Sequence, residues 1–229
     1  MKFLTYLTDL FYPPICLSCG RKLIDYENVI CSYCKVQLPK TNFHYQKNNP
    51  VEILFWGRCE IYSAAAIYRY LKKGKVQNLI HNFKYKGYFE IGLYLGEKYG
   101  VQLMQADRFK NVDFIIPVPL HPKKLRKRGF NQSEIFGRGL AKTMSAKLDN
   151  DNLYRKVHTA TQTRKSRWER FKNVESIFGI RDAKKLKGKH LLIVDDVITT
   201  GSTIEACVVK LQEIDGVKIS VAAIATAAH

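Results

Sequence analysis

Apolar residues follow two regular patterns along the chain, and together they predict alternating strands and helices. Continuous apolar runs of strand length occur at residues 61–70, 113–119, 190–196 and 217–226. Apolar residues spaced along one helical face occur at residues 71–87, 90–105, 133–148 and 201–214. Because the two kinds of segment alternate, the pattern favours a parallel α/β sheet with helices packed on it.

Two segments lack any such period and divide the chain further. Residues 39–50 are polar, so we interpret residues 39–57 as a linker between a small N-terminal unit, residues 1–38, and a main domain, residues 58–229. A length of 229 residues suits one main domain with a small appendage. The second polar segment, TQTRKSRWERFKNV at residues 161–174, is predicted to be a long charged loop.

The runs of apolar residues are too short for a membrane span. Hydrophobic residues make up 46% of the chain, but no apolar run approaches the roughly 18–20 residues that a span requires. The opening, MKFLTYLTDLFYPPIC, contains Asp9 and no small-residue cleavage site, so it predicts an amphipathic start and not a signal peptide. We therefore expect a cytoplasmic protein without membrane insertion.

Four of the six cysteines form two close pairs near the N-terminus. Their arrangement is Cys16-x2-Cys19-x11-Cys31-x2-Cys34, and each pair can turn two thiolates toward one ion. A disulfide framework is the alternative, but nothing in the sequence suggests export to an oxidising compartment. We predict one structural Zn²⁺ bound by these four cysteines in a finger that spans residues 1–38.

A second motif, LLIVDDVITTGST at residues 191–203, joins a buried strand to a helix. The strand brings Asp195 and Asp196 to its carboxyl end, where open α/β sheets bind their ligands. Beyond the strand, backbone N–H groups and side-chain hydroxyls can surround a phosphate, and Gly201 allows the backbone to approach that phosphate closely. The hydroxyls are those of Thr199, Thr200, Ser202 and Thr203. Two acids beside a phosphate site would serve sugar hydroxyls or Mg²⁺.

Helix capping is the alternative explanation of this motif, since Asp and Thr commonly occupy caps. A cap does not require two acids, three threonines, a serine and a glycine within one short segment. We therefore interpret the segment as a ligand site. For Asn131, which precedes another predicted helix, capping and ligand contact both stay open.

Positive charge is concentrated near the motif. The formal charge of the chain is +18, and residues 121–172 contain 15 Lys and Arg against 4 Asp and Glu. Such an excess attracts polyanions, either the phosphates of a small ligand or a nucleic-acid backbone. A solvated surface is the alternative, but this basic block flanks the phosphate motif and does not form a tail.

The motifs together resemble a known family. VDDVITTGST is similar to the phosphoribosyl pyrophosphate (PRPP) motif of the type I phosphoribosyltransferases. With the four-cysteine start, PVPLHPKKLRKRGFNQS and TQTRKSRWERFKNV, nearly the whole chain resembles the ComF family, which is associated with competence for DNA uptake in bacteria. The resemblance implies a phosphoribosyltransferase-type parallel sheet with flanking helices, preceded by a small zinc-binding knuckle.

The resemblance also implies a role for each part of the site. Asp195 and Asp196 would hold the ribose 2- and 3-hydroxyls and, through the ligand, Mg²⁺, while residues 199–203 would bind the 5-phosphate. The segment PVPLHPKKLRKRG would be the pyrophosphate loop, and it offers Lys123, Lys124, Arg126 and Arg128. The charged loop would close over the site. Its candidates for facing the departing pyrophosphate are Arg164, Lys165, Arg167 and Arg170.

Two functions are compatible with these features. The first is a protein that binds Mg–PRPP and acts in DNA uptake, with single-stranded DNA and proteins of an uptake system as possible partners. The second is a working phosphoribosyltransferase, which would pass the phosphoribosyl group to a nitrogen acceptor such as a nucleobase. The sequence contains no segment from which an acceptor pocket can be predicted, and a fold does not fix a function.

Overall fold

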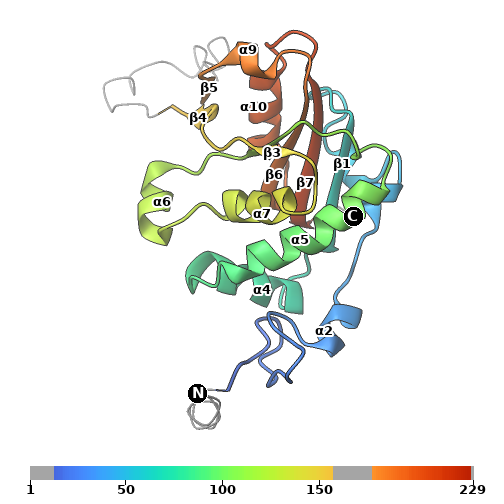
Figure 1. Cartoon of the computed structure of the whole chain (residues 1–229), viewed down its shortest axis with the longest axis vertical. Helices are drawn as coiled ribbons and strands as arrows, with labels where there is room; N and C mark the ends of the chain where they lie inside the picture. The colour runs from blue at the N-terminus through green and yellow to red at the C-terminus, as the bar shows by residue number, and fades with distance from the viewer. Residues whose placement is uncertain (1–12, 157–176, 228–229) are drawn as a thin grey trace.

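The computed structural model describes residues 13–156 and 177–227 and contains strands and helices in the alternating order expected (Figure 1). The strands are β1 (Ser63–Arg69), β2 (Phe114–Pro117), β3 (Lys147–Leu148), β4 (Leu153–Arg155), β5 (Phe178–Ile180), β6 (His190–Ile198) and β7 (Lys218–Thr226). The helices are α2 (Ser32–Gln37), the 3-10 helix η1 (Phe43–Tyr45), α3 (Pro50–Ile53), α4 (Lys75–Tyr85), α5 (Glu90–Gln105), α6 (Pro122–Arg128), α7 (Gln132–Ala141), α9 (Ala183–Leu186) and α10 (Ser202–Leu211).

Five strands form the central sheet in the order β1-β7-β6-β2-β3, and every neighbouring pair is parallel. In the middle of the sheet, Val194 of β6 is paired with Ala222 of β7 on one side and with Pro117 of β2 on the other. The inner strands consist almost wholly of buried apolar residues, as expected for strands covered on both faces. The predicted parallel sheet is confirmed.

The order of the strands defines a point where the chain reverses its direction of travel across the sheet. From β2 the chain passes through α7 to β3 at one edge, whereas from β6 it passes through α10 to β7 in the opposite direction. Right-handed crossovers therefore place α7 and α10 on opposite faces. A crevice forms at such a reversal, here between the carboxyl ends of β2 and β6.

Helix α5 forms an outer layer over α7, on the near face of the sheet in Figure 1. Their backbones approach so closely that a Cβ on Gly96 would lie 2.8 Å from the Cα of Gly139. Only glycine fits at this crossing. The close contact lies in the C-terminal half of α7, and the N-terminal end of the same helix faces the crevice.

Two expected elements differ from those observed. The helix expected at residues 133–148 ends at Ala141, because the apolar residues that follow form the short edge strand β3 beside β2. The basic segment expected to be a turn forms helix α6 instead. Pro122 occupies its first turn, His121 Nδ1 accepts a hydrogen bond from the backbone N–H of Lys123 at 3.1 Å, and Gly129 ends it with φ of 80°.

Residues 39–57, expected to be a linker, pack along β1. The side chains of Phe43, Val51 and Phe55 are buried in the core. The backbone N–H of Thr41 donates to Ile67 O at 3.0 Å, and Asn49 Nδ2 donates to Ala64 O at 2.8 Å. The polar composition concealed these contacts because single apolar residues alternate with polar ones.

The N-terminal unit lies beside α4, at the lower end of the molecule in Figure 1. Asn82 Nδ2 donates to Leu17 O at 2.8 Å, and Asn78 Nδ2 donates to Ser18 O at 3.3 Å. The Ser18 hydroxyl in turn donates to Lys75 O at 3.2 Å. Within the described residues, no helix has the length and apolar character of a membrane span.

Candidate functional site

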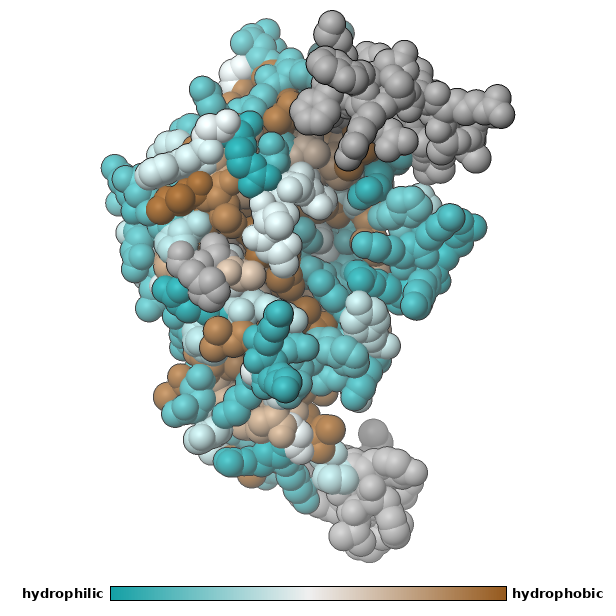
Figure 2. Space-filling view, turned by 180° about the vertical axis from the view of Figure 1, so that it is seen from behind, coloured by the Kyte–Doolittle hydropathy of each residue, from teal (hydrophilic) through white to brown (hydrophobic). Residues whose placement is uncertain are grey.

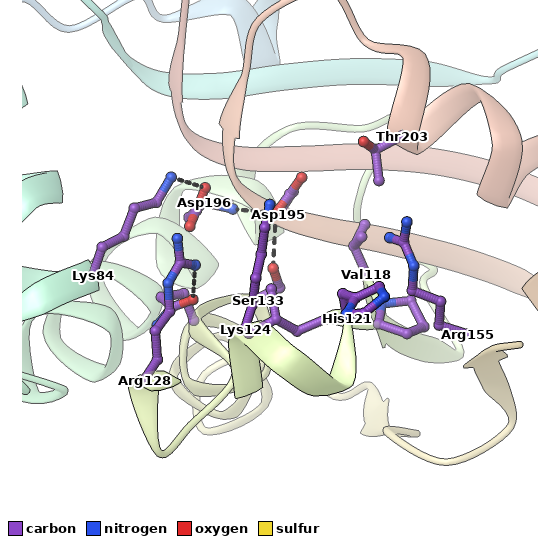
Figure 3. A pocket seen from close by; sticks show the side chains of 13 residues that line it. Lys84, Val118, His121, Lys124, Arg128, Ser133, Arg155, Asp195, Asp196 and Thr203 are labelled. Carbon is purple, nitrogen blue, oxygen red and sulfur yellow. Dashed lines mark hydrogen bonds and ion pairs between the residues drawn. The ribbon is translucent and has the colours of Figure 1, made fainter. Parts of the chain in front are cut away.

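A crevice of about 250 Å³ opens at the carboxyl ends of β2 and β6, at the point of chain reversal. Its wall includes residues 118–121, which follow β2, and the first residues of α7 and α10. The charged and hydroxyl side chains in its lining are those of Lys84, Lys124, Arg128, Ser133, Arg155, Asp195, Asp196 and Thr203 (Figure 3). Two carboxylates thus face at least four cationic side chains across one small space.

The two aspartates lie beyond the last residue of β6 that pairs with β2. Each has a different partner. Ser133 Oγ, at the start of α7, donates to Asp195 Oδ1 at 2.8 Å, while Lys84 Nζ lies 2.8 Å from Asp196 Oδ1. The backbone N–H of Asp196 also donates to Asp195 Oδ1 at 2.8 Å. Figure 3 shows Lys84 reaching the acids from α4 and Ser133 reaching them from α7.

Burial and mutual repulsion disfavour two charges on this pair. Burial, together with the charge of the neighbouring Asp196, raises the pKa of the Asp195 carboxyl to about 7. The hydroxyl of Ser133 and the ammonium group of Lys84 act in the opposite direction. A ligand that brings hydroxyl donors or a cation to these carboxylates would relieve the repulsion.

A small hollow of about 40 Å³ follows directly, between the end of β6 and the first turn of α10. It is lined by residues 197–204 and by Asp195, and no side chain caps the N-terminus of α10. Thr199, Thr200, Ser202 and Thr203 are exposed there. The first N–H groups of a helix and free hydroxyls are the donors that a phosphate requires.

Gly201 and Arg58 hold this loop in place. Gly201 has φ of 74°, and a Cβ on it would lie 3.1 Å from the ring of Phe55. Arg58 Nη1 donates to Thr200 O at 2.7 Å, and Nη2 donates to Ser202 Oγ at 3.3 Å and to Glu205. Phe55, in the segment expected to be a linker, and Arg58, the residue directly after that segment, thus support the hollow.

The four cationic residues expected in the pyrophosphate loop divide into two groups. Lys124 and Arg128 line the crevice, and Arg128 Nη1 also donates to Gln132 Oε1 at 2.7 Å. Lys123 and Arg126 do not line it and are exposed on α6. Figure 2 shows α6 as a hydrophilic projection from the body of the molecule.

The remaining predicted residues lie either outside the described part of the chain or at the start of α7. Arg164, Lys165, Arg167 and Arg170 lie outside the described residues. Asn131 caps α7: its Oδ1 accepts from the backbone N–H of Ser133 at 3.1 Å, while its Nδ2 donates to Val118 O. Lys84, Ser133 and Arg155 were not predicted from the sequence, because each comes from an element remote from the motif in the chain.

The four cysteines expected to bind metal come together in the N-terminal unit. Their sulfur atoms all lie within 4.8 Å of one another, and Cys19 Sγ lies 3.7 Å from Cys31 Sγ. A tetrahedral zinc site with Zn–S bonds of about 2.3 Å separates its sulfurs by about 3.8 Å. Burial alone would raise the pKa of the Cys16 thiol, but the backbone N–H groups of Cys31, Cys19 and Ser18 lower it to about 7. The cluster could therefore hold a thiolate-binding metal such as zinc.

Comparison with known proteins agrees with this architecture. Residues 133–229 match the family described as Phosphoribosyl transferase domain. DNA utilization protein YhgH of Escherichia coli O6:H1 is 34% identical over 129 residues, which cover 55% of this chain and 56% of that protein. Competence protein F of Haemophilus influenzae is 28% identical over 202 residues, which cover 82% of this chain and 86% of that protein. The chain is therefore similar to a competence protein, to DNA utilization proteins and, over residues 133–229, to the phosphoribosyl transferase domain.

Two solved structures match part of the chain, with low sequence identity and TM-scores below 0.5. Adenine phosphoribosyltransferase is 16% identical, with a TM-score of 0.40, and the match covers 64% of this chain and 74% of the enzyme. Glutamine phosphoribosylpyrophosphate amidotransferase from B. subtilis is 18% identical, with a TM-score of 0.42, and the match covers 62% and 30% of the two chains. The chain spans little more than half the length of the YhgH proteins that it matches.

Proposed function

We propose that the crevice binds Mg–PRPP and that the protein belongs to the ComF family and acts in DNA uptake. One observation above all supports the ligand. The carboxylates of Asp195 and Asp196 lie directly beside a hollow of about 40 Å³ at the start of α10. Sugar hydroxyls suit the two carboxylates, and a phosphate suits the hollow. A ribose 5-phosphate contains hydroxyls and a phosphate a short distance apart.

The rest of the crevice offers a place for the pyrophosphate. Lys124 and Arg128 face it from α6, Lys84 from α4, and Arg155 from β4. Several cations around one small space stabilise a highly anionic group, and they stabilise it more as charge develops on departing oxygens.

The donor set also suits Mg²⁺ bound together with the ligand. Magnesium prefers oxygen ligands and is commonly held by one or two carboxylates and by substrate phosphates. Asp195 and Asp196 supply carboxylate oxygens within the crevice. The bound ion would neutralise part of the pyrophosphate charge.

A DNA role is supported by two observations. The relatives are named as a competence protein and as DNA utilization proteins. In addition, Lys123, Arg126 and Lys127 are exposed on α6 and do not line the crevice, so the basic block extends beyond the space that PRPP would fill. Backbone phosphates of a single strand are a suitable partner for such a surface.

Calorimetric titration with Mg–PRPP tests the ligand. Replacing Asp195 and Asp196 together by Asn removes their charge and keeps their size, so we expect a large loss of affinity without loss of stability. The double variant loses the ion pair between Lys84 and Asp196, but it also loses the repulsion between the two carboxylates. These two effects on the free energy of unfolding should offset each other. The matched control replaces Asp107 and Asp215, two exposed acids outside the crevice, by Asn. Equal affinity in both double variants would contradict the proposed site.

A working transferase is the second candidate. The observation that favours it is a second cavity, of about 420 Å³, between α4 and the ends of β1 and β6.

A further inference from the structure

Exposed aromatic rings gather at the turn between α4 and α5. Tyr85, the last residue of α4, is 59% exposed, and Phe89, just before α5, is 54% exposed. Gly87 lies between them with φ of 74° and turns the chain there. The ring of Phe130 contacts that of Phe89, and we name Tyr85, Phe89 and Phe130 the aromatic ledge. None of the three rings lines the crevice.

The aromatic ledge is continuous with α6. The guanidinium group of Arg128, the last residue of that helix, lies over the Tyr85 ring at 5.4 Å from its centroid. Two residues later, the Phe130 ring lies nearly edge-on to that of Phe89, with centroids 6.2 Å apart, and 5.8 Å from the buried ring of Phe83. The contact with Phe83 anchors the ledge on the core. In Figure 1 the α4–α5 turn and α6 lie on the same side of the molecule.

The segments that carry the ledge contain cations and no acids. Residues 70–89 contain five Lys, residues 118–131 contain five Lys and Arg, and neither segment contains Asp or Glu. Lys86, Arg126 and Lys127 among these cations are exposed. Exposed rings interleaved with cations are typical of sites for single-stranded nucleic acid, where bases stack on the rings and the backbone follows the positive charge.

We propose, resting on the DNA role proposed above, that the aromatic ledge stacks unpaired bases of a DNA strand whose phosphates contact α6. Every base has an aromatic face, so stacking on Tyr85 and Phe89 requires no particular sequence. Phosphate contacts alone do not distinguish a single strand from a duplex, because both carry a phosphate backbone. In a duplex the base faces are covered by neighbouring bases, so the ledge selects unpaired DNA.

Stacking and phosphate contacts respond differently to salt. Each phosphate contact releases counterions, so the slope of affinity against salt concentration reports the number of such contacts. Stacking on an uncharged ring releases no counterions. Removal of the ledge rings should therefore weaken DNA binding by the same factor at every salt concentration, whereas removal of α6 cations should change the slope.

Three variants test the ledge. The ledge variant changes Tyr85 and Phe89 together to Leu, which removes both exposed rings and keeps apolar side chains in their place. Its matched control changes Tyr26 and Trp56, two exposed rings outside the ledge, to Leu. Tyr85→Phe, which keeps the ring and removes only the hydroxyl, is the conservative variant. Thermal unfolding of each variant checks that the fold is kept.

The probes are a labelled oligothymidylate, an abasic strand of the same length and a duplex, added to the full chain. Fluorescence anisotropy at several salt concentrations gives affinity and slope. We expect the oligothymidylate to bind about tenfold or more tightly than the abasic strand, the effect of one stacked base. The ledge variant should lose this advantage at an unchanged salt slope and bind the abasic strand as the unaltered chain does. The control and Tyr85→Phe should keep the advantage.

The possible failures are distinguishable. If the unaltered chain bound none of the three probes, the DNA role proposed above would be overturned, and the ledge with it. If it bound the oligothymidylate but bound the abasic strand or the duplex equally well, or if the ledge variant and its control bound alike, the ledge alone would be overturned. Tighter binding to phosphatidylglycerol vesicles than to the oligothymidylate, lost only in the ledge variant, would assign the rings to a membrane surface instead.

Discussion

At the scale of single residues, the candidate site is a small set of opposite charges. The carboxylates of Asp195 and Asp196 face the cationic side chains of Lys84, Lys124, Arg128 and Arg155. Asp195, Asp196 and the hydroxyls of residues 199–203 could be predicted because strand, loop and helix are continuous in the sequence. Lys84 could not, because its contact with Asp196 depends on how α4 packs on the sheet. The pattern of α4 indicated its buried face and nothing about the ends of its long side chains.

Lys84→Met should show how much this ion pair contributes. The ammonium group lies 2.8 Å from Asp196 and lines the crevice, so the substitution removes one cation from the proposed pyrophosphate site. We expect Mg–PRPP affinity to fall about tenfold, the scale of one charged hydrogen bond. Calorimetry measures it, with Lys86→Met, an exposed position just beyond the same helix, as the control. Equal affinities in the two variants would show that Lys84 does not contact the ligand.

His190 should make stability depend on pH. Burial, together with the nearby charge of Lys218, lowers the pKa of His190 to about 4. Its Nδ1 lies 3.1 Å from Asn111 O and its Nε2 lies 2.7 Å from Ser220 Oγ, so the neutral ring donates to the first and accepts from the second.

The sign of the effect follows from the lowered pKa. Between pH 6.5 and about 4 the unfolded chain binds a proton at His190 that the folded chain does not, so stability is full above this window and is lost as the pH falls through it. The loss should reach about 3 kcal/mol. Denaturant unfolding of the chain and of His190→Gln measures it. The difference between the two should shrink toward low pH, and a constant difference would contradict the assignment.

At the scale of elements, the long segments were predictable and the short ones were not. The helix at Glu90–Gln105 and the strands β6 and β7 have enough residues to establish a period. Strands β4 and β5, with three residues each, are defined by pairing with one another and by little in their sequences. Helix α6 has no buried residue, so its sequence shows caps and charge but no apolar face.

Helix α6 presents its cations in two directions, and this division predicts two separable effects. Changing Lys123, Arg126 and Lys127 together to Ala should lower the salt dependence of single-stranded DNA binding by about 2 units of slope, at about 0.7 per phosphate contact. Mg–PRPP affinity should be kept, because these side chains do not line the crevice.

The companion variant changes Lys124 and Arg128 to Ala and should have the larger effect on Mg–PRPP. Fluorescence anisotropy with labelled DNA at several salt concentrations gives the slope, and calorimetry gives the PRPP affinity. An unchanged slope in the triple variant would show that α6 does not contact DNA phosphates. Complete loss of DNA binding at saturating Mg–PRPP would mean that DNA merely occupies the phosphate site.

At the scale of the whole molecule, the fold joins a small cysteine-rich unit to the sheet through α4. The N-terminal unit contacts α4 at Lys75, Asn78 and Asn82. Later residues of the same helix line both the crevice and the second cavity, of about 420 Å³. The cysteine spacing predicted the cluster, since the ligand pairs are local. The contact with α4 was not predictable, because it uses backbone carbonyls that any sequence supplies.

Metal removal should affect this unit first. We expect one zinc per chain, and a chelator should unfold residues 13–38 while the sheet stays folded, because a structural metal supplies much of the folding free energy of so small a unit. Hydrogen exchange followed by mass spectrometry measures the loss of protection. Cys34→Ser should abolish zinc retention, whereas Cys59→Ser, outside the cluster, should keep it. Full protection after complete metal removal would contradict a structural role.

The hydrogen bonds from Asn82 and Asn78 to Leu17 and Ser18 make α4 a shared support for two distant sites. Whatever free energy the metal contributes to the position of α4 is available to a ligand that Lys84 contacts, and thermodynamic linkage requires the coupling to be equal in both directions. If zinc and PRPP bind as proposed, bound PRPP would raise the affinity for zinc, and zinc would raise the affinity for PRPP by the same factor. A cell short of zinc would then bind the proposed nucleotide precursor less tightly, at a site that contains none of the four cysteines.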